Sequence, residues 1–307
     1  MAKSIFIVHF DVVQGCQLLC VGCPNSTIRA KVRQIPVDDF SRVLGNLDVD
    51  KIHTLRLFNF GEALLHRELA RLVALIPEQK WKVAVVEIST NAQHVYWDDF
   101  EDMLKLQVVN RLVVSCDGDG TPESYERTRP PAKWAKLIEF LERTQALRDR
   151  HCPSMQLVTR SICDPEPAEN RQRWRDVLEP RGWKPEFRRW QFFPESSENK
   201  TGRKLKVPEG ACFFMANSLE FPKAWDGEMN LLGVDIEGIV RPCCFHPKAG
   251  DLGNLLTQTY SEVLAGRQRS DFIAALSKDR ASMPVCSSCD VGPLGNEGPS
   301  FFAGMDR

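Results

Sequence analysis

The chain has 307 residues, and its 40 Lys and Arg against 41 Asp and Glu leave a net charge of −1. Nucleic-acid-binding proteins are more often basic, so this balance argues against a nucleic acid as partner. Apolar residues make up an ordinary 43%, and no apolar run reaches the roughly 18 residues that a membrane helix needs. The apolar run Ile5 to Phe10 is too short for a signal peptide, so we expect a cytoplasmic protein without a membrane partner.

The first two thirds of the chain alternate short apolar runs with amphipathic stretches, which predicts strands and helices in turn. Strands are predicted at residues 4–13, 54–60, 83–89, 111–116, 154–163 and 187–193, and helices at 37–47, 68–76, 97–106, 134–147 and 170–178. About six strand–helix units indicate an α/β fold with a parallel sheet and helices outside. Six units are too few for a closed eight-fold barrel, so we expect a partial (β/α)6 parallel barrel.

The pattern changes after Pro194, where a polar stretch at 196–211 is interpreted as a linker. It divides a core at 1–195 from a small cysteine-rich domain at 212–307. The segments 230–235 and 238–241 predict a hairpin, and short helices are predicted at 260–265 and 271–276. This tail has too little apolar content for a core of its own, so we expect its cysteines to hold it together.

Cysteine is the unusual component, because the chain has 11 of them. In a reducing compartment structural disulfides are not expected, which leaves metal or redox chemistry as the expected use. Three cysteines cluster near the N-terminus and five lie in the last third. The remaining three are scattered: Cys116, Cys152 and Cys163. Of these, Cys116 and Cys163 fall in apolar strands and are expected in the core.

Cys16, Cys20 and Cys23 form a C-x3-C-x2-C motif directly after the first predicted strand. Three thiolates this close can hold three corners of a [4Fe–4S] cube and leave the fourth iron open, unlike the usual four-cysteine arrangement. A zinc site is the alternative, with His9 or His53 as a possible fourth ligand. We favour the iron–sulfur cluster, because the motif lies at the carboxyl end of a strand, where sites of parallel barrels form.

With this motif in this position, the chain resembles the radical S-adenosylmethionine (SAM) superfamily. The resemblance implies that the three cysteines hold a [4Fe–4S] cluster whose open iron binds SAM. An electron from the cluster then yields a 5′-deoxyadenosyl radical, which abstracts hydrogen. The electron donor would be a flavodoxin- or ferredoxin-type protein. Three later strand ends carry the remaining SAM-binding candidates that the resemblance implies: Gly61 and Glu62 for the amino group, Thr90 and Asn91 for the ribose and carboxylate, and Ser115 and Asp117.

One position departs from the superfamily, which usually has an aromatic residue just before the third cysteine. This chain has Gly22 there, so contact with the adenine must come from elsewhere. Arg160 lies in an apolar strand and needs a partner if it is buried. It is a candidate for binding the SAM carboxylate or a substrate hydroxyl, or for acting as a base. Arg188 and Arg189 are expected to be solvated.

Four tail cysteines supply enough thiolates for a closed site, and zinc is again the alternative. They are Cys212, Cys243, Cys286 and Cys289. Their order resembles the Twitch extension, a shortened SPASM extension of radical SAM enzymes, which implies an auxiliary [4Fe–4S] cluster behind the substrate pocket. Cys243 and Cys244 compete for one ligand position, and we expect Cys243 because the family places its ligand after the proline.

The chain as a whole resembles the aminoglycoside-pathway members, the 2-deoxy-scyllo-inosamine dehydrogenases and the neomycin C epimerases. This implies hydrogen abstraction from a small polar substrate, with oxidation of a carbinol of an aminocyclitol or aminosugar as the first expectation and Arg160 or another base taking the proton. In an epimerase, Cys244 would return hydrogen to the opposite face. Carboxylates that could bind the amines are Asp117, Asp119, Asp164, Glu195 and Asp235.

Three further functions stay open. One is peptide modification, which is less expected because Cys16 lies too near the start to leave room for a leader-binding domain. The second is 3-amino-3-carboxypropyl transfer, which would use the same three cysteines. The third is a non-catalytic metal-binding module, which does not account for an open three-cysteine site.

Overall fold

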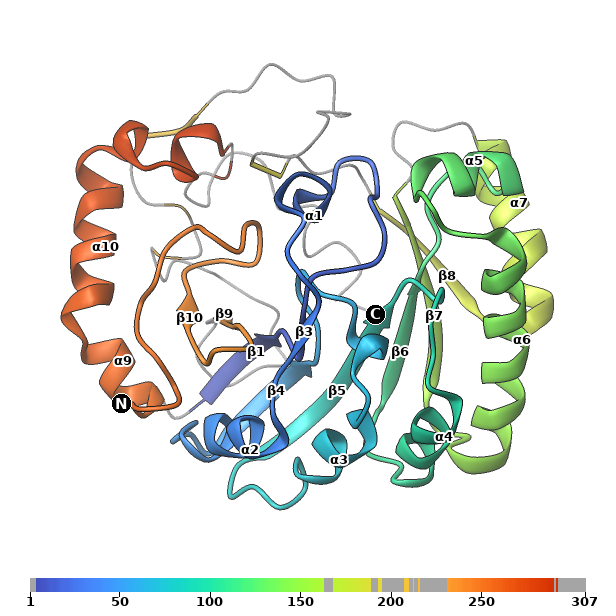
Figure 1. Cartoon of the computed structure of the whole chain (residues 1–307), viewed down its shortest axis with the longest axis horizontal. Helices are drawn as coiled ribbons and strands as arrows, with labels where there is room; N and C mark the ends of the chain where they lie inside the picture. The colour runs from blue at the N-terminus through green and yellow to red at the C-terminus, as the bar shows by residue number, and fades with distance from the viewer. Residues whose placement is uncertain are drawn as a thin grey trace.

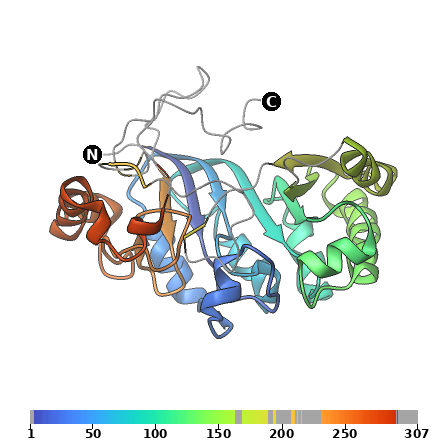
Figure 2. The same ribbon diagram turned by 90° about the horizontal axis from the view of Figure 1, so that it is seen from above.

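A curved sheet with helices on its outer face forms the frame of the molecule (Figures 1 and 2). The computed structural model describes residues 4–162, 168–188, 193–194, 207–209, 212, 215, 231–289 and 291. Its eight-stranded sheet has the order β10-β9-β1-β4-β5-β6-β7-β8. Six of these strands are parallel neighbours: β1 Ser4–Phe10, β4 Lys51–Arg56, β5 Lys82–Thr90, β6 Arg111–Ser115, β7 Gln156–Ile162 and β8 Lys184–Arg188. The predicted α/β partial barrel is confirmed.

The helices between these strands cover the outer face of the sheet, as the amphipathic stretches predict (Figure 2). In the first of them, Phe40, Val43 and Leu44 are buried, a spacing that places them on one helical face. All seven residues of β1 are buried as well, because the sheet is covered on both sides there. The helices are α2 Val37–Gly45, α3 Leu69–Ala74, α4 Trp97–Lys105, α6 Trp134–His151 and α7 Ala168–Leu178.

Several short elements were not predicted. Two of them, α1 Pro24–Ile28 and α5 Pro122–Thr128, begin with proline, which suits the first turn of a helix. A two-stranded ribbon pairs β2 Val13–Gln14 with β3 Arg33–Gln34 and closes the base of the cysteine loop. Four 3-10 turns complete the described part: η1 Ala63–Leu65, η2 Glu179–Arg181, η3 Arg280–Ser282 and η4 Cys286–Ser288.

The C-terminal hairpin joins the main sheet instead of standing apart from it. Its strands are β9 Leu231–Val234 and β10 Val240–Arg241, and β9 pairs in parallel with β1, Ile7 opposite Leu231. The predicted hairpin is therefore present, but the core that it packs on belongs to the barrel. The predicted linker at 196–211 lies outside the described residues except for 207–209.

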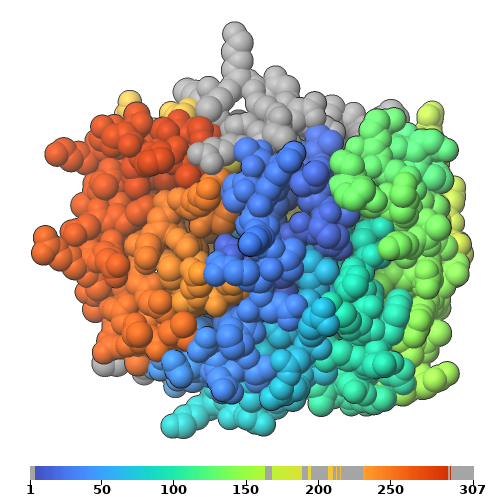
Figure 3. Space-filling model, in the orientation of Figure 1, coloured from blue at the N-terminus to red at the C-terminus, as the bar shows by residue number. Residues whose placement is uncertain are grey.

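The two helices of the tail are also fastened to the barrel. They are α9 Tyr260–Ala265 and α10 Arg267–Lys278. The backbone N–H of Tyr260 donates to the carbonyl of Asn46 over 2.9 Å, and the Asn46 amide donates to the carbonyl of Leu255 over 2.7 Å. In the space-filling view the C-terminal segment forms one continuous surface with the N-terminal segment (Figure 3). No helix in the described ranges is long and apolar enough to cross a membrane.

Candidate active site

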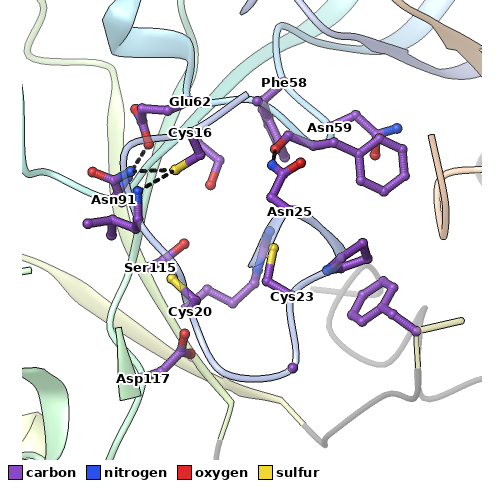
Figure 4. A pocket seen from close by; sticks show the side chains of 18 of the residues that line it. Cys16, Cys20, Cys23, Asn25, Phe58, Asn59, Glu62, Asn91, Ser115 and Asp117 are labelled. Carbon is purple, nitrogen blue, oxygen red and sulfur yellow. Dashed lines mark hydrogen bonds between the residues drawn. The ribbon is translucent and has the colours of Figure 1, made fainter. Parts of the chain in front are cut away.

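The three N-terminal cysteines line a cavity of about 360 Å³ at the carboxyl ends of the central strands (Figure 4). A turn shapes their loop: the N–H of Cys23 donates to the carbonyl of Cys20 over 3.2 Å, and the Ser26 hydroxyl donates to the same carbonyl. Gly22, which lies between Cys20 and Cys23, has φ +79°, a left-handed conformation in which an aromatic side chain would be strained. The departure from the superfamily at this position therefore matches the backbone of this loop.

The chemistry of this loop suits an iron–sulfur cluster. The thiol of Cys16 accepts N–H bonds from Leu18 and from the Asn91 amide, both at 3.4 Å, and such bonds stabilise cluster-bound sulfur. Burial raises the pKa of Cys16 to about 12 and that of Cys20 to about 11, so iron must displace protons to bind them. Within the described ranges no three His, Cys, Asp or Glu side chains converge as ligands of a single ion. A cube binds its thiolates at separate corners and does not need that convergence.

Asp11 shapes the turn that follows β4. Its carboxylate oxygen Oδ1 accepts the backbone N–H groups of Asn59, Phe60 and Gly61 over 2.9, 2.8 and 2.9 Å. These three bonds end the strand, which was predicted to continue to residue 60 and instead stops at Arg56. At Gly61 a Cβ atom would lie 1.6 Å from the carbonyl oxygen of Val13, so only glycine allows this close approach.

The turn presents Glu62 to the end of the next strand (Figure 4). The Glu62 carboxylate accepts bonds from the Thr90 hydroxyl, from the Asn91 N–H and from the Leu64 N–H over 2.6, 2.7 and 3.1 Å. Burial raises its pKa, while these donors act in the opposite direction. Since Asn91 also donates to Cys16, four predicted residues and the first cysteine form one connected group: Gly61, Glu62, Thr90, Asn91 and Cys16.

Ser115 and Asp117 line the same cavity, as predicted, but Asp117 is already engaged. It forms an ion pair with Arg129 and accepts the N–H of Ile162 over 3.0 Å. Arg129 is buried beside Cys20, whose pKa it lowers against the larger effect of burial. Arg129 was not predicted from the sequence, because a single arginine before a Pro-Pro pair belongs to no recognisable motif.

Of the other carboxylates predicted to bind amines, the described ones are also engaged. Asp119 accepts the N–H and the hydroxyl of Thr121 over 3.0 and 2.7 Å. Asp235 accepts Nε and Nη2 of Arg241 over 3.0 and 2.5 Å. Neither of them is among the residues that line the cavity. Asp164 and Glu195 lie outside the described residues.

The tail cysteines lie near one another. Burial raises the pKa of the Cys243 thiol, with Cys244, Cys212 and Cys289 acting in the same direction, and burial raises the pKa of Cys286, with Cys212 acting in the same direction. Arg280 ties two of their segments together by donating to the carbonyls of Cys286 and Cys289 over 3.1 and 2.9 Å. Cys244 lines the cavity and Cys243 does not.

Arg160 has the partners that its burial requires. Its guanidinium lies 3.4 Å from Glu186 and 3.9 Å from Glu87. The expectation for Arg188 is wrong: its side chain is only 20% exposed, lies 3.4 Å from Glu186 and lines the cavity. The reason is that Arg188 lies two residues after Glu186 on β8, so both side chains are on the same face of the strand, where Glu186 pairs with Arg111 and Arg160. Arg189 lies outside the described residues.

Comparison with known proteins agrees with this geometry. Residues 226–290 match a family described as SPASM, an iron–sulfur cluster-binding domain. The solved structure of BtrN in complex with AdoMet and 2-DOIA is 16% identical, with a TM-score of 0.55 over 98% of this chain and 99% of that one. The structure of anSMEcpe with bound AdoMet is 13% identical, with a TM-score of 0.61 over 95% and 92%. No curated protein matches by sequence.

The chain thus has the fold of the radical SAM enzymes. The SPASM match at residues 226–290 lies in the tail whose cysteine order resembles the Twitch extension, and the fold agrees with the resemblance drawn from the N-terminal cysteine motif. The matched domain is one that binds iron–sulfur clusters, and both similar structures hold AdoMet, which agrees with the predicted cofactors, [4Fe–4S] clusters and SAM.

We predict that Gly61→Ala removes SAM binding and lowers the free energy of unfolding by at least about 2 kcal/mol, because the new methyl group must push β2 away. Gly45→Ala is the matched control, since a Cβ there meets nothing within 4 Å. Urea denaturation and equilibrium dialysis with SAM measure both effects. Equal behaviour of the two variants would contradict the close approach at Gly61.

We predict that Asp11 makes the free energy of unfolding depend on pH. Burial raises its pKa to about 7, above its value in the unfolded chain, so the stability that protonated Asp11 contributes is lost as the pH rises through 7. Asp11→Asn removes this loss. In urea denaturation of the metal-free protein, the variant should gain about 2 kcal/mol on the wild type between pH 5 and pH 8. A difference that does not change with pH would contradict the raised pKa.

Proposed function

We propose that the chain is a radical SAM enzyme that cleaves SAM reductively and oxidises a carbinol of a small polar substrate of the aminocyclitol or aminosugar type. The observation that carries the proposal is the connected group of Cys16, Asn91 and Glu62 beside Cys20 and Cys23 in one cavity. Likeness to BtrN, solved with AdoMet and 2-DOIA, supports a small-molecule substrate. A flavodoxin- or ferredoxin-type protein is the proposed electron donor.

The residues that line the cavity have separate proposed roles. When bound, the SAM-ligated cluster supplies a 5′-deoxyadenosyl radical that abstracts hydrogen, and the auxiliary cluster supplies an acceptor for the second electron. Cys16, Cys20 and Cys23 would hold the first cluster. Glu62 and Asn91 would bind the polar end of SAM, since their acceptor oxygens and amide are already oriented by Thr90 and the backbone. Apolar lining residues then exclude water from the radical.

Arg160 is better suited to holding the substrate oxygen than to taking its proton, because arginine stays protonated in proteins. His9 lines the same cavity, and burial lowers its pKa well below its usual value, with Arg56 acting in the same direction. Its imidazole is therefore neutral, and it would hold a proton only transiently, because a lowered pKa makes it a weak base. We propose His9 as the proton acceptor and Arg160 as the residue that positions the carbinol.

Epimerisation is the second candidate, and Cys244 is the observation that favours it. This thiol lines the cavity, and burial raises its pKa to about 12, so it stays neutral and retains its S–H hydrogen. Such a thiol can return a hydrogen atom to a substrate radical. In this arrangement Cys212, Cys243, Cys286 and Cys289 would hold the auxiliary cluster.

The remaining alternatives differ in their products. Likeness to anSMEcpe, also solved with AdoMet and the Cp18Cys peptide, keeps peptide modification open. A 3-amino-3-carboxypropyl transferase would release 5′-methylthioadenosine instead of 5′-deoxyadenosine. A non-catalytic module would release neither. Identifying the nucleoside by chromatography therefore separates these functions from the proposed one.

The iron content of the protein tests the two proposed cluster sites. The anaerobically reconstituted protein should bind close to eight iron atoms, since each of the two clusters holds four. Changing Cys16, Cys20 and Cys23 together to Ala should leave about four and abolish formation of 5′-deoxyadenosine. Iron analysis and chromatography give both numbers. A triple variant that keeps all of its iron would show that the cluster lies elsewhere.

The variant Cys244→Ala tests whether this thiol donates hydrogen to the substrate radical. In an epimerase, Cys244→Ala should keep its iron and still form 5′-deoxyadenosine, while the epimerised product disappears. Wild-type product formed in D2O should carry one deuterium at the inverted carbon, through exchange at the thiol. An oxidised product without deuterium selects the dehydrogenase. Loss of iron in Cys244→Ala would make this residue a ligand.

A further inference from the structure

The inner face of the barrel carries a largely buried charge network, of which the proposed chemistry uses only Arg160. Within the described part of the chain it contains four arginines and two glutamates, which leaves two positive charges in excess. Its members come from five neighbouring parallel strands, β4 to β8: Arg56, Glu87, Arg111, Arg160, Glu186 and Arg188. His9 on β1 adds no charge, because burial keeps it neutral.

The two carboxylates lie on one side of this network and the cavity on the other. The side chain of Glu87 is 2% exposed, and it lies 3.2 Å from Arg56 and 3.5 Å from Arg111. Glu186 pairs with Arg111, Arg160 and Arg188. Neither glutamate lines the cavity, whereas Arg56, Arg160 and Arg188 do. A molecule in the cavity therefore meets cations first.

One arginine that faces the cavity also keeps hydrogen-bonding capacity. The Nε atom of Arg160 is buried and has no hydrogen-bond acceptor among the described residues, whereas Nε of Arg56 lies 3.2 Å from Glu87. Buried cations are costly unless paired, and a guanidinium fits a carboxylate or phosphate in a two-bond contact. A cavity wall with excess positive charge and a spare N–H group is suited to an anion.

We propose that the substrate carries an anionic group, a carboxylate or a phosphate, which Arg56 and Arg160 bind and Arg188 flanks. This rests on the proposed function, because it takes the cavity as the substrate site. It also restricts the substrate class. Asp117, Asp119 and Asp235 are engaged by arginine, hydroxyl or backbone groups, so an amine finds few described acceptors. An aminocyclitol or aminosugar substrate would therefore be an acid or a phosphate ester.

The test measures anion binding in the reconstituted holoenzyme with SAM present and without reductant. SAM must be present because it has a carboxylate of its own. Inorganic phosphate and acetate are titrated separately by calorimetry, and the tighter of the two identifies a phosphate ester or a carboxylate. Saturable binding of one anion in the wild type supports the proposal. Absence of binding by both anions while SAM is bound overturns it.

Arginine variants test whether the anion binds to the arginines that line the cavity. Arg160→Gln should weaken binding about tenfold or more, and Arg160→Lys should restore part of it by keeping the charge. Arg111→Gln is the matched control, because Arg111 belongs to the same network and pairs with both glutamates but does not line the cavity. It should bind within about twofold of the wild type. Equal weakening in Arg111→Gln and Arg160→Gln would mean that only the total charge matters, and would overturn the proposal.

A parallel measurement separates this inference from the proposed function. Formation of 5′-deoxyadenosine is followed after reduction, without phosphate or acetate. Anion binding without SAM cleavage would sink the proposed enzyme and leave the anion site standing. SAM cleavage without anion binding would keep the enzyme and reject the anionic substrate.

Discussion

The carboxylate of Asp11 holds the arrangement on which the whole site depends. One of its oxygens accepts hydrogen bonds from three consecutive backbone N–H groups. These bonds turn the chain away from β4 into the Gly61–Glu62 turn. Glu62 is thereby brought to the end of β5, where it meets Thr90 and Asn91, and Asn91 reaches Cys16. A buried acid far from any reacting atom thus links three strand ends and the cysteine loop. Without it, the polar candidates would be separate residues on separate loops.

The interior of the barrel combines two kinds of constraint. Apolar packing fills the outer layer between sheet and helices, while the inner layer carries ion pairs that span neighbouring strands. The strand register sets Glu87 opposite both Arg56 and Arg111, so each charge has a partner fixed by backbone pairing. Fixed partners of this kind keep long side chains in one orientation and limit the freedom of the cavity wall.

The sequence predicts the barrel and most of its site because both depend on local patterns. Strand–helix alternation gives the order of elements, and strand ends of a parallel sheet meet at one edge, so Glu62 and Asn91 are expected beside the cysteines. What it does not predict depends on distant pairing. The place of β9 next to β1, the engagement of Asp117 by Arg129 and the inward position of Arg188 each follow from contacts between segments far apart in the chain. Periodicity carries no signal for such contacts.

One shared strand connects the two ends of the molecule. The first cysteine loop follows β1, and the tail hairpin that leads to Cys243 is hydrogen-bonded along the same strand through β9. The position of Cys243 relative to the first cysteine loop is therefore set by a sheet register, which is among the stiffest connections a protein has. Electron tunnelling falls steeply with distance, and a register cannot drift by fractions of a residue as a hinge between domains can. In an enzyme with both clusters, this register would hold the Cys243 side of the auxiliary centre in place, whereas Cys286 and Cys289 follow α10 in the chain and would move with it.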